Sequence, residues 1–142
     1  MSKRLLSLLL IISILMSSSL ITSVDAESRA SDYFIRYSAT LSTGDSAGEL
    51  NLIYRVSTSV VGITRLGIIA LFVYRTDGSI AKLVTGNTSN GLLVTSGTIA
   101  VGTYSFTMEP GVAYYCAVRF IAENASGNDI RYYTTNTVIA PL

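Results

Sequence analysis

Residues 112–139 read VAYYCAVRFIAENASGNDIRYYTTNTVI, and this stretch decides the fold. Up to residue 122, apolar side chains occupy the even-numbered positions, and a cluster of turn-forming residues follows at 124–129. Alternation with a period of two predicts a strand with one buried face, and the turn predicts that 130–139 returns beside it. The C-terminal part of the chain is therefore expected to form a long antiparallel hairpin.

The same period continues upstream of this hairpin. Apolar side chains alternate with mainly polar ones at the odd positions of 33–41 and at the even positions of 50–56. Residues 66–74 are apolar at both parities apart from Gly67, which predicts a central strand covered on both faces. Further strands are expected at 80–84, with Lys82 on an exposed edge, and at 92–95, 98–101 and 103–108.

Turn-forming residues separate these strands. Asp77-Gly78 favours a tight primed hairpin turn within 75–79, because such turns need positive φ angles. A loop is expected at 85–91 and a further turn at 109–111. Seven to nine short strands in about 110 residues, with no helical period after the first 26, indicate an all-β sandwich or barrel.

The first 26 residues have the features of an export signal. Two basic residues precede an apolar run at 5–16, and Val24-Asp25-Ala26 offers short side chains for cleavage before Glu27. The run is shorter than the roughly 20 residues that cross a bilayer. We therefore expect a signal peptide at 1–26, a single secreted domain at 27–142, and no membrane span after cleavage. An uncleaved membrane anchor is the alternative.

Composition argues against several classes of function. Cleavage would remove Lys3, Arg4 and Asp25, which leaves eight basic and eight acidic residues on 116. A domain so close to neutral is not expected to bind nucleic acid or anionic membrane through its charge. The chain has no His, the commonest general base and transition-metal ligand, and its single Cys116 allows no internal disulfide. We expect no cofactor.

Residues 104–120 resemble the region between strands E and F of immunoglobulin-like and fibronectin type III domains. The resemblance lies in Met108-x-Pro110-Gly111-x-x-Tyr114, followed by apolar side chains at even positions. It implies a single antiparallel β-sandwich in which Tyr114 enters the core and its hydroxyl bonds to backbone a few residues upstream. This chain departs from the pattern in having no second Cys and no Trp, so Cys116 is expected to be a buried small side chain.

Three other stretches, 29–34, 37–39 and 124–138, resemble a family of small secreted proteins of Gram-positive bacteria. That family is classified as a domain of unknown function. The resemblance implies export and a β-rich domain, and it supplies no activity and no catalytic residue.

The outward face of the C-terminal hairpin is the candidate interaction site. If the turn pairs Glu123 with Ile130, then Arg119 lies opposite Thr134, and the odd positions of 112–123 share the outward face. Aromatic, arginine and aliphatic side chains together are typical of an interaction surface. Alternatively, other strands or a loop cover this face, or cross-strand packing alone explains these residues. The candidate patch consists of Tyr115, Arg119, Ile121 and Tyr132.

The remaining polar residues do not form a recognisable catalytic motif. The acidic residues are scattered, and no nucleophile, phosphate-binding or metal-binding pattern is present. Turn chemistry explains the oxygen-rich segments 87–90 and 124–129 better than calcium does. We therefore expect a secreted, non-catalytic binding or structural module that engages an extracellular protein, a glycan or copies of itself. The alternative is a small secreted enzyme or toxin-like effector.

Overall fold

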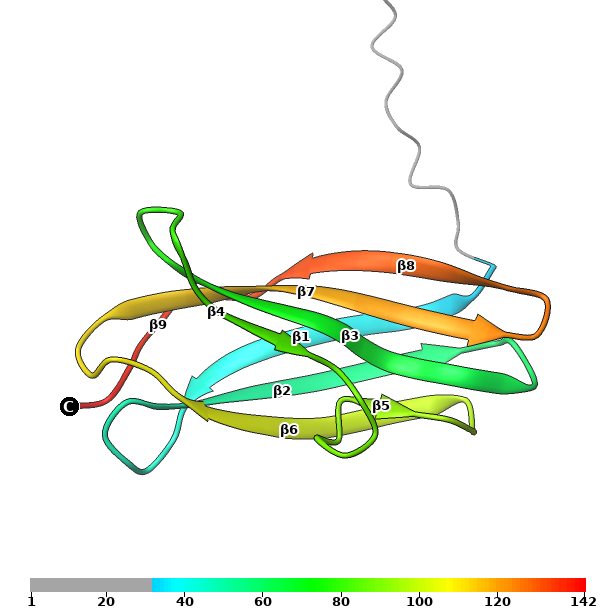
Figure 1. Ribbon diagram of the computed structural model, residues 1–142, viewed down its shortest axis with the longest axis horizontal. Coiled ribbons are helices and arrows are strands. Elements are labelled where there is room, and N and C mark those ends of the chain that lie inside the picture. Colours follow the sequence, from blue (N-terminus) through cyan, green and yellow to red (C-terminus); the bar gives the residue numbers. More distant parts are fainter. Residues whose placement is uncertain (1–31) are drawn as a thin grey trace, which may run out of the picture. The chain divides into compact units, whose positions relative to one another are not determined.

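The computed structural model describes residues 32–142 (Figure 1). The predicted signal peptide at 1–26 lies outside the described residues. The described part contains nine strands: β1 (Phe34–Thr43), β2 (Glu49–Thr58), β3 (Ile63–Arg75), β4 (Ile80–Thr85), β5 (Leu93–Val94), β6 (Ile99–Thr107), β7 (Ala113–Asn124), β8 (Gly127–Thr134) and β9 (Val138–Ile139).

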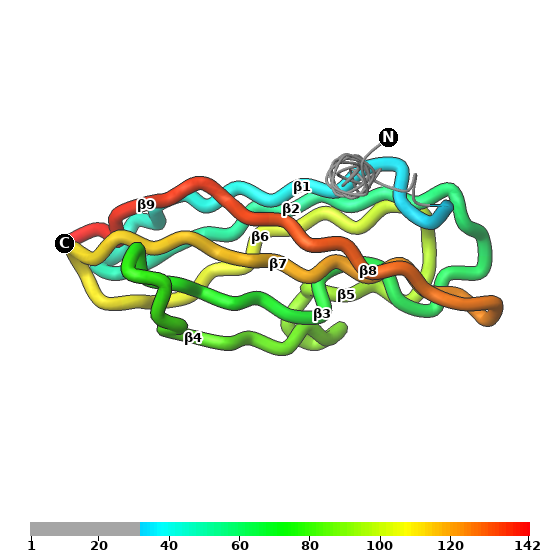
Figure 2. The backbone as a smooth tube through the Cα atoms, turned by 90° about the horizontal axis from the view of Figure 1, so that it is seen from above, coloured from blue at the N-terminus to red at the C-terminus, as the bar shows by residue number. Residues whose placement is uncertain are grey.

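These strands form two antiparallel sheets that pack face to face. One sheet has three strands in the order β1-β2-β6. The other has six strands, with β4-β3-β7-β8 as its main path, β5 added to β3, and β9 added to β7. Figure 2 shows β4, β3, β7 and β8 side by side. This arrangement is an immunoglobulin-like or fibronectin type III-like β-sandwich, so the predicted fold class is confirmed.

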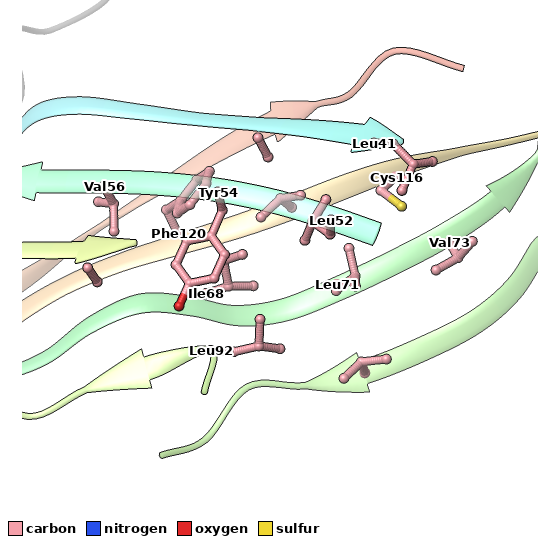
Figure 3. Close-up of a cluster of buried hydrophobic side chains, with 14 of the residues drawn as sticks. Leu41, Leu52, Tyr54, Val56, Ile68, Leu71, Val73, Leu92, Cys116 and Phe120 are labelled. Carbon is pink, nitrogen blue, oxygen red and sulfur yellow. The ribbon is translucent and has the colours of Figure 1, made fainter. Parts of the chain in front are cut away.

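The core lies between the two sheets and is built by alternate side chains, as the period of two predicts (Figure 3). In β2 the even positions Leu50, Leu52, Tyr54 and Val56 are all buried, as expected. The even positions of β7, which include Cys116 and Phe120, meet them from the opposite sheet. Both strands of the predicted C-terminal hairpin are present as β7 and β8.

Strand β3 departs from the sequence-based expectation of coverage on both faces. Its buried positions change from even, at Leu66 and Ile68, to odd, at Leu71 and Val73. A β-bulge between Ile68 and Ala70 inserts the extra residue that changes the parity. The outward side chains beyond the bulge are only half-buried, because the described residues form no third layer over them.

Two loop residues, Gly86 and Leu92, form hydrogen bonds with the backbone groups of this bulge. The N–H of Ile68 donates to the carbonyl oxygen of Leu92 at 2.7 Å, and the N–H of Gly86 donates to that of Ile69 at 3.0 Å. A Cβ on Gly86 would lie 1.7 Å from the Ile68 oxygen, so the loop can approach the bulge this closely only with glycine at 86. The loop therefore holds the bulge in place.

Three further expectations are wrong in detail. A bulge between Phe34 and Arg36 in β1 buries Phe34 and leaves Ile35 70% exposed. The expected strands at 98–101 and 103–108 are one strand, β6, in which Gly102 leaves room for the ring of Tyr54 opposite it.

The third detail concerns the turn between β3 and β4, which is not a primed turn. Gly78 has a φ of 86°, but no non-glycine residue has a positive φ among the described residues. Asp77 instead stabilises the turn through its carboxylate, which accepts from the Ser79 backbone N–H at 2.8 Å and from the Ser79 hydroxyl at 2.6 Å. The expected hairpin itself is present, and β4 is the edge strand that Lys82 was expected to occupy.

The contact between Gly86 and the bulge predicts a large effect of a small substitution. We expect Gly86→Ala to lower the free energy of unfolding by about 2 kcal/mol or more, because either the loop or the bulge must move. Gly44→Ala is the matched control, since its new Cβ would meet the side chain of Glu49, which can move at the cost of its exposed hydrogen bonds to residues 45 and 46, whereas at Gly86 the Cβ meets backbone. Denaturant unfolding of both variants measures the difference, and equal losses would contradict the role assigned to Gly86.

Candidate functional site

The outward side of the six-stranded sheet carries a group of aromatic and aliphatic side chains around one arginine. They come from β3, β4, β7 and β8, which lie side by side (Figure 2). We call this surface the aromatic face and define it as Phe72, Tyr74, Leu83, Tyr115, Arg119 and Tyr132.

The strand register explains why these residues share one side. Tyr74 pairs with Tyr115 across β3 and β7, and Phe72 pairs with Leu83 across β3 and β4. Arg119 pairs with Tyr132 across β7 and β8. Residues directly opposite each other in antiparallel strands project to the same side of the sheet, so the pairs lie next to one another.

The rings of Tyr74 and Tyr115 are stacked. Their centroids are 5.3 Å apart and their planes differ by 12°. Phe72 stacks on Tyr74 less closely, with centroids 6.5 Å apart and planes that differ by 27°. Each ring in the closer pair therefore covers part of one face of the other, which leaves edges and hydroxyl groups to meet a ligand.

Arg119 lies on the same side of the sheet, opposite Ala70 and Tyr132, and forms no ion pair within the described part of the chain. Its guanidinium carbon is 5.5 Å from the centroid of the Tyr132 ring, a cation–π contact. Its Nε is buried and has no hydrogen-bond partner among the described residues. The ion pairs of this part of the chain join Arg65 to Glu123 and Arg131 to Asp129, and neither acid contacts Arg119.

The predicted register of the C-terminal hairpin is wrong by two residues. Glu123 pairs with Asn128 instead of Ile130, and Arg119 pairs with Tyr132 instead of Thr134. The turn is tighter than expected, since only residues 125 and 126 lie between the strands and the Asn124 side chain accepts from the Ser126 N–H at 3.0 Å. An even shift keeps every side chain on its predicted side, so Tyr115, Arg119 and Tyr132 still share a face.

Ile121, the fourth residue of the candidate patch, projects to the same side but is only 2% exposed. It pairs with Gly67, and Gly67 pairs on its other side with the buried Leu93 of β5. Because Gly67 has no side chain, the backbone of residues 92 and 93 occupies the place of a Cβ, 2.1 Å from it at the Leu92 oxygen, and Leu93 and Ile121 lie buried on this side of the sheet. Ile121 therefore contributes packing and no accessible surface.

Sequence reasoning missed Phe72, Tyr74 and Leu83 as members of this face. The available signal was the run 66–74, which is apolar at both parities. That run was interpreted as a strand covered on both sides, whereas a strand with an apolar open face has the same composition. The exposed side chains Leu83 at 58% and Tyr132 at 68% show that the face is open.

Tyr114 occupies the core as expected, but the hydrogen bond typical of a tyrosine corner is not formed. Its hydroxyl is buried without a partner among the described residues. The upstream carbonyl groups of Glu109 and Val112 accept instead from the N–H groups of Val112, at 3.4 Å, and Ala140, at 3.0 Å. The segment that leads out of β9 thus occupies backbone that a tyrosine corner would use.

Cys116 is buried and free, as predicted. Burial raises the pKa of the Cys116 thiol from its ordinary 9.0 to about 12, although a hydrogen bond with Thr135 opposes the shift. The thiol therefore stays protonated and unreactive at neutral pH, which assigns it a packing role.

Most acidic side chains for which a contact is known stabilise turns or form ion pairs. Arg65 donates to Glu123 from Nε at 3.0 Å and from the terminal nitrogen at 2.6 Å, and this holds the pKa of Glu123 below its usual range. Hydrogen bonds from Ser79 lower the pKa of Asp77 in the same sense. Glu49 accepts from the backbone of residues 45 and 46. These carboxylates therefore stabilise the local structure around them.

Other features offer less chemistry. An open hollow of about 340 Å³ lies between the β2–β3 and β5–β6 connections, and it is lined by Val60, Val61, Gly62, Ile63, Ser96, Gly97 and Thr98. Within residues 32–142, no group of three or more His, Cys, Asp or Glu side chains could hold a metal ion. No helix in the same range is long and apolar enough to cross a membrane.

Comparison with known proteins adds no assignment to this geometry. No protein-family model matches the chain, and the search of curated proteins found no match.

The burial of Ile121 and the exposure of Tyr132 predict opposite outcomes for two substitutions on one face. Ile121→Ala should lower the free energy of unfolding by about 2–5 kcal/mol, because it opens a cavity. Tyr132→Ala should change it by at most about 1 kcal/mol, the contribution of an exposed cation–π contact. Denaturant unfolding measures both values. Large losses for both variants would mean that the whole face is covered, and small losses for both would mean that Ile121 is as exposed as Tyr132. Either result would contradict this arrangement.

The raised pKa of Cys116 predicts a loss of stability in alkali. Above about pH 9 the thiol of the unfolded chain ionises while the folded thiol keeps its proton until about pH 12, so unfolding releases a proton in this window. Stability should therefore fall as pH rises, by up to about 1.4 kcal/mol per pH unit for this one group. Cys116→Ala removes the group, and its unfolding free energy should fall less steeply between these pH values. Parallel curves would contradict the assignment.

Proposed function

We propose that this protein is a secreted, non-catalytic binding module and that the aromatic face is its binding surface. The observation that carries the proposal is an open, largely apolar surface over four neighbouring strands, with Tyr132 68% and Leu83 58% exposed. Contiguous exposed apolar surfaces on soluble proteins mark sites of interaction. Tyrosine and arginine, both present here, are enriched in such sites.

The outer face of the opposite sheet supports the proposal by contrast. There, three exposed aliphatic side chains, Ile53, Ile99 and Val101, lie among polar residues and no aromatic ring is exposed with them, and Ser105 donates to Asn51 at 2.6 Å. Both outer faces belong to the same small domain. If apolar residues were placed on the surface only to stabilise the fold, the two faces would be expected to have a similar composition. The difference between them favours a specific role for the aromatic face.

The positions of the acidic residues favour binding over catalysis. Hydrolytic mechanisms need carboxylates that converge on a substrate with suitably shifted pKa values. Glu123 and Asp77 are held in their ionised forms by local partners, and neither lies in a cleft with a second acid. No specific observation favours the alternative of a small enzyme or toxin-like effector.

The place of action outside the cell rests on the sequence. The basic residues, apolar run and short side chains of 1–26 support export. The resemblance of 29–34, 37–39 and 124–138 to small secreted proteins of Gram-positive bacteria supports the same proposal. The partner would then be met at the cell surface or in the medium.

Paired substitutions on the two outer faces test the proposed surface. The protein recovered from its producer is added to washed producing cells and sedimented with them, and its self-association is measured by analytical ultracentrifugation. Tyr132→Ser combined with Leu83→Ser should weaken the observed association about tenfold or more, since it removes exposed contact residues from both edge strands of the face.

The matched control is Ile53→Ser combined with Val101→Ser, which removes two exposed apolar side chains from the opposite sheet. This variant should associate like the unchanged protein, and both variants should keep the same unfolding midpoint within a few degrees. If the two double variants bind equally well, the aromatic face is not the binding surface.

A further inference from the structure

We infer that the partner of the aromatic face is a polypeptide segment that presents a carboxylate, flanked by apolar side chains, to Arg119. This inference rests on the proposed function and names the chemistry of the ligand at that surface. It is argued from the charge of the face, the state of its arginine and the arrangement of its rings.

The aromatic face carries a single charge, and no acid within residues 32–142 forms an ion pair with it. Arg119 pairs with Ala70 on one side and Tyr132 on the other, and its Nε finds no acceptor among residues 32–142. The nearest acid along β7, Glu123, is already bound by two nitrogens of Arg65. An arginine half-buried among rings, with Nε buried and unpartnered, has lost part of its hydration without gaining a hydrogen bond.

A carboxylate is the group that best compensates this arginine. The guanidinium is planar and donates two parallel hydrogen bonds to the two oxygens of one carboxylate. Tyr132 holds the guanidinium in place before binding, because the cation lies over its ring. The surrounding apolar side chains would exclude water from the ion pair and thereby strengthen it.

Charge argues against a second copy of the chain as the partner. A symmetric face-to-face dimer presents the same surface from both copies, so each aromatic face would bring its own unpaired arginine. Glu123, the acid of β7 on the same side of the sheet, is already paired with Arg65, and the six residues of the aromatic face include no acid that could receive the arginine of the other copy. Like charges brought together in a dry interface oppose association.

The arrangement of the rings argues against a glycan as the partner, and the presence of only one positive charge on the aromatic face argues against a nucleic acid. A sugar ring binds to the open face of an aromatic side chain, but Tyr74 and Tyr115 cover part of each other's faces at 5.3 Å. A phosphate backbone is bound by several cations at once, and this face offers one. Phe72 on β3 and Tyr132 on β8, the strands on either side of β7, instead match apolar side chains on either side of an acidic residue.

Peptide selection followed by a double-mutant cycle tests the inference. Random 12-residue peptides displayed on phage are selected on the immobilised full-length protein, and enriched sequences are synthesised. We expect Asp or Glu next to aromatic or branched aliphatic residues. By titration calorimetry, Arg119→Gln and acid-to-amide substitution in the peptide should each weaken binding about tenfold to a hundredfold. The two losses should not add, because both remove one contact.

Two variants serve as controls. Arg55→Gln removes an exposed arginine from the outer face of the opposite sheet and should leave the affinity unchanged. Arg119→Lys keeps the charge without the planar pair of donors and should bind with intermediate affinity, which a mere loss of folding would not produce. Unfolding midpoints of all variants are measured alongside.

The outcomes separate this inference from the proposed function. If the selected peptides lose binding with Tyr132→Ser and Leu83→Ser but not with Arg119→Gln, the inference that a carboxylate binds Arg119 is wrong, and the proposal that the aromatic face is the binding surface stands. Peptides unaffected by either change would overturn both. Selection of no peptide, or binding on a glycan array alone, would also overturn the inference.

Discussion

The β-bulge between Ile68 and Ala70 is the constraint on which both the core and the aromatic face depend. It changes the parity of β3, so that Leu71 and Val73 point into the core where an unbroken strand would have sent Phe72 and Tyr74. The same shift brings the two aromatic rings to the outer side, in register with β7. The loop at 86–92 fixes this arrangement through hydrogen bonds to Ile68 and Ile69, and the lack of a side chain at Gly86 allows the loop to approach. One local irregularity therefore determines what the domain hides and what it presents.

The parts of the fold that follow a regular period could be predicted from sequence, and the parts that depend on bulges could not. β2 and β7 keep one parity without a bulge, and their inward residues were predicted correctly, whereas the burial of the outward Ile121 was not. In β1 and β3 an extra residue changes the parity, and nothing in the local composition marks where. The apolar run at 66–74 looks two-sided in sequence because it combines a change of parity with an apolar outer face. Bulges are stabilised by contacts with distant loops, so a single strand contains too little information to locate them.

The same distinction explains how much of the candidate site could be predicted. Tyr115, Arg119 and Tyr132 belong to the regular β7–β8 hairpin, and an error of two residues in the register left them on the correct side. Their neighbours on β3 could be found only once the bulge was known. The burial of Ile121 depends on Gly67 and Leu93, which are distant in sequence and meet it only in the assembled sheet. The side of the sheet to which a residue projects thus follows from the pattern of its own strand, whereas its exposure depends on what the neighbouring strands place around it.

The residues that hold the fold together and those that form the aromatic face are separate sets. Neither the core cluster nor the partly buried hydrophobic residues packed against it include any member of the face. Exposed side chains add little to the free energy of folding, because most of their surface stays in contact with water. The exposed Leu83 and Tyr132 are therefore not required for stability, whereas the half-buried rings on β3 and β7 add cross-strand packing. Stability also does not require an arginine whose Nε has lost its water without gaining a partner. The buried Nε cannot itself meet a ligand, so the acceptor of a second molecule would bind the terminal nitrogens of the same guanidinium, and this interaction explains better why a group is placed at such a cost.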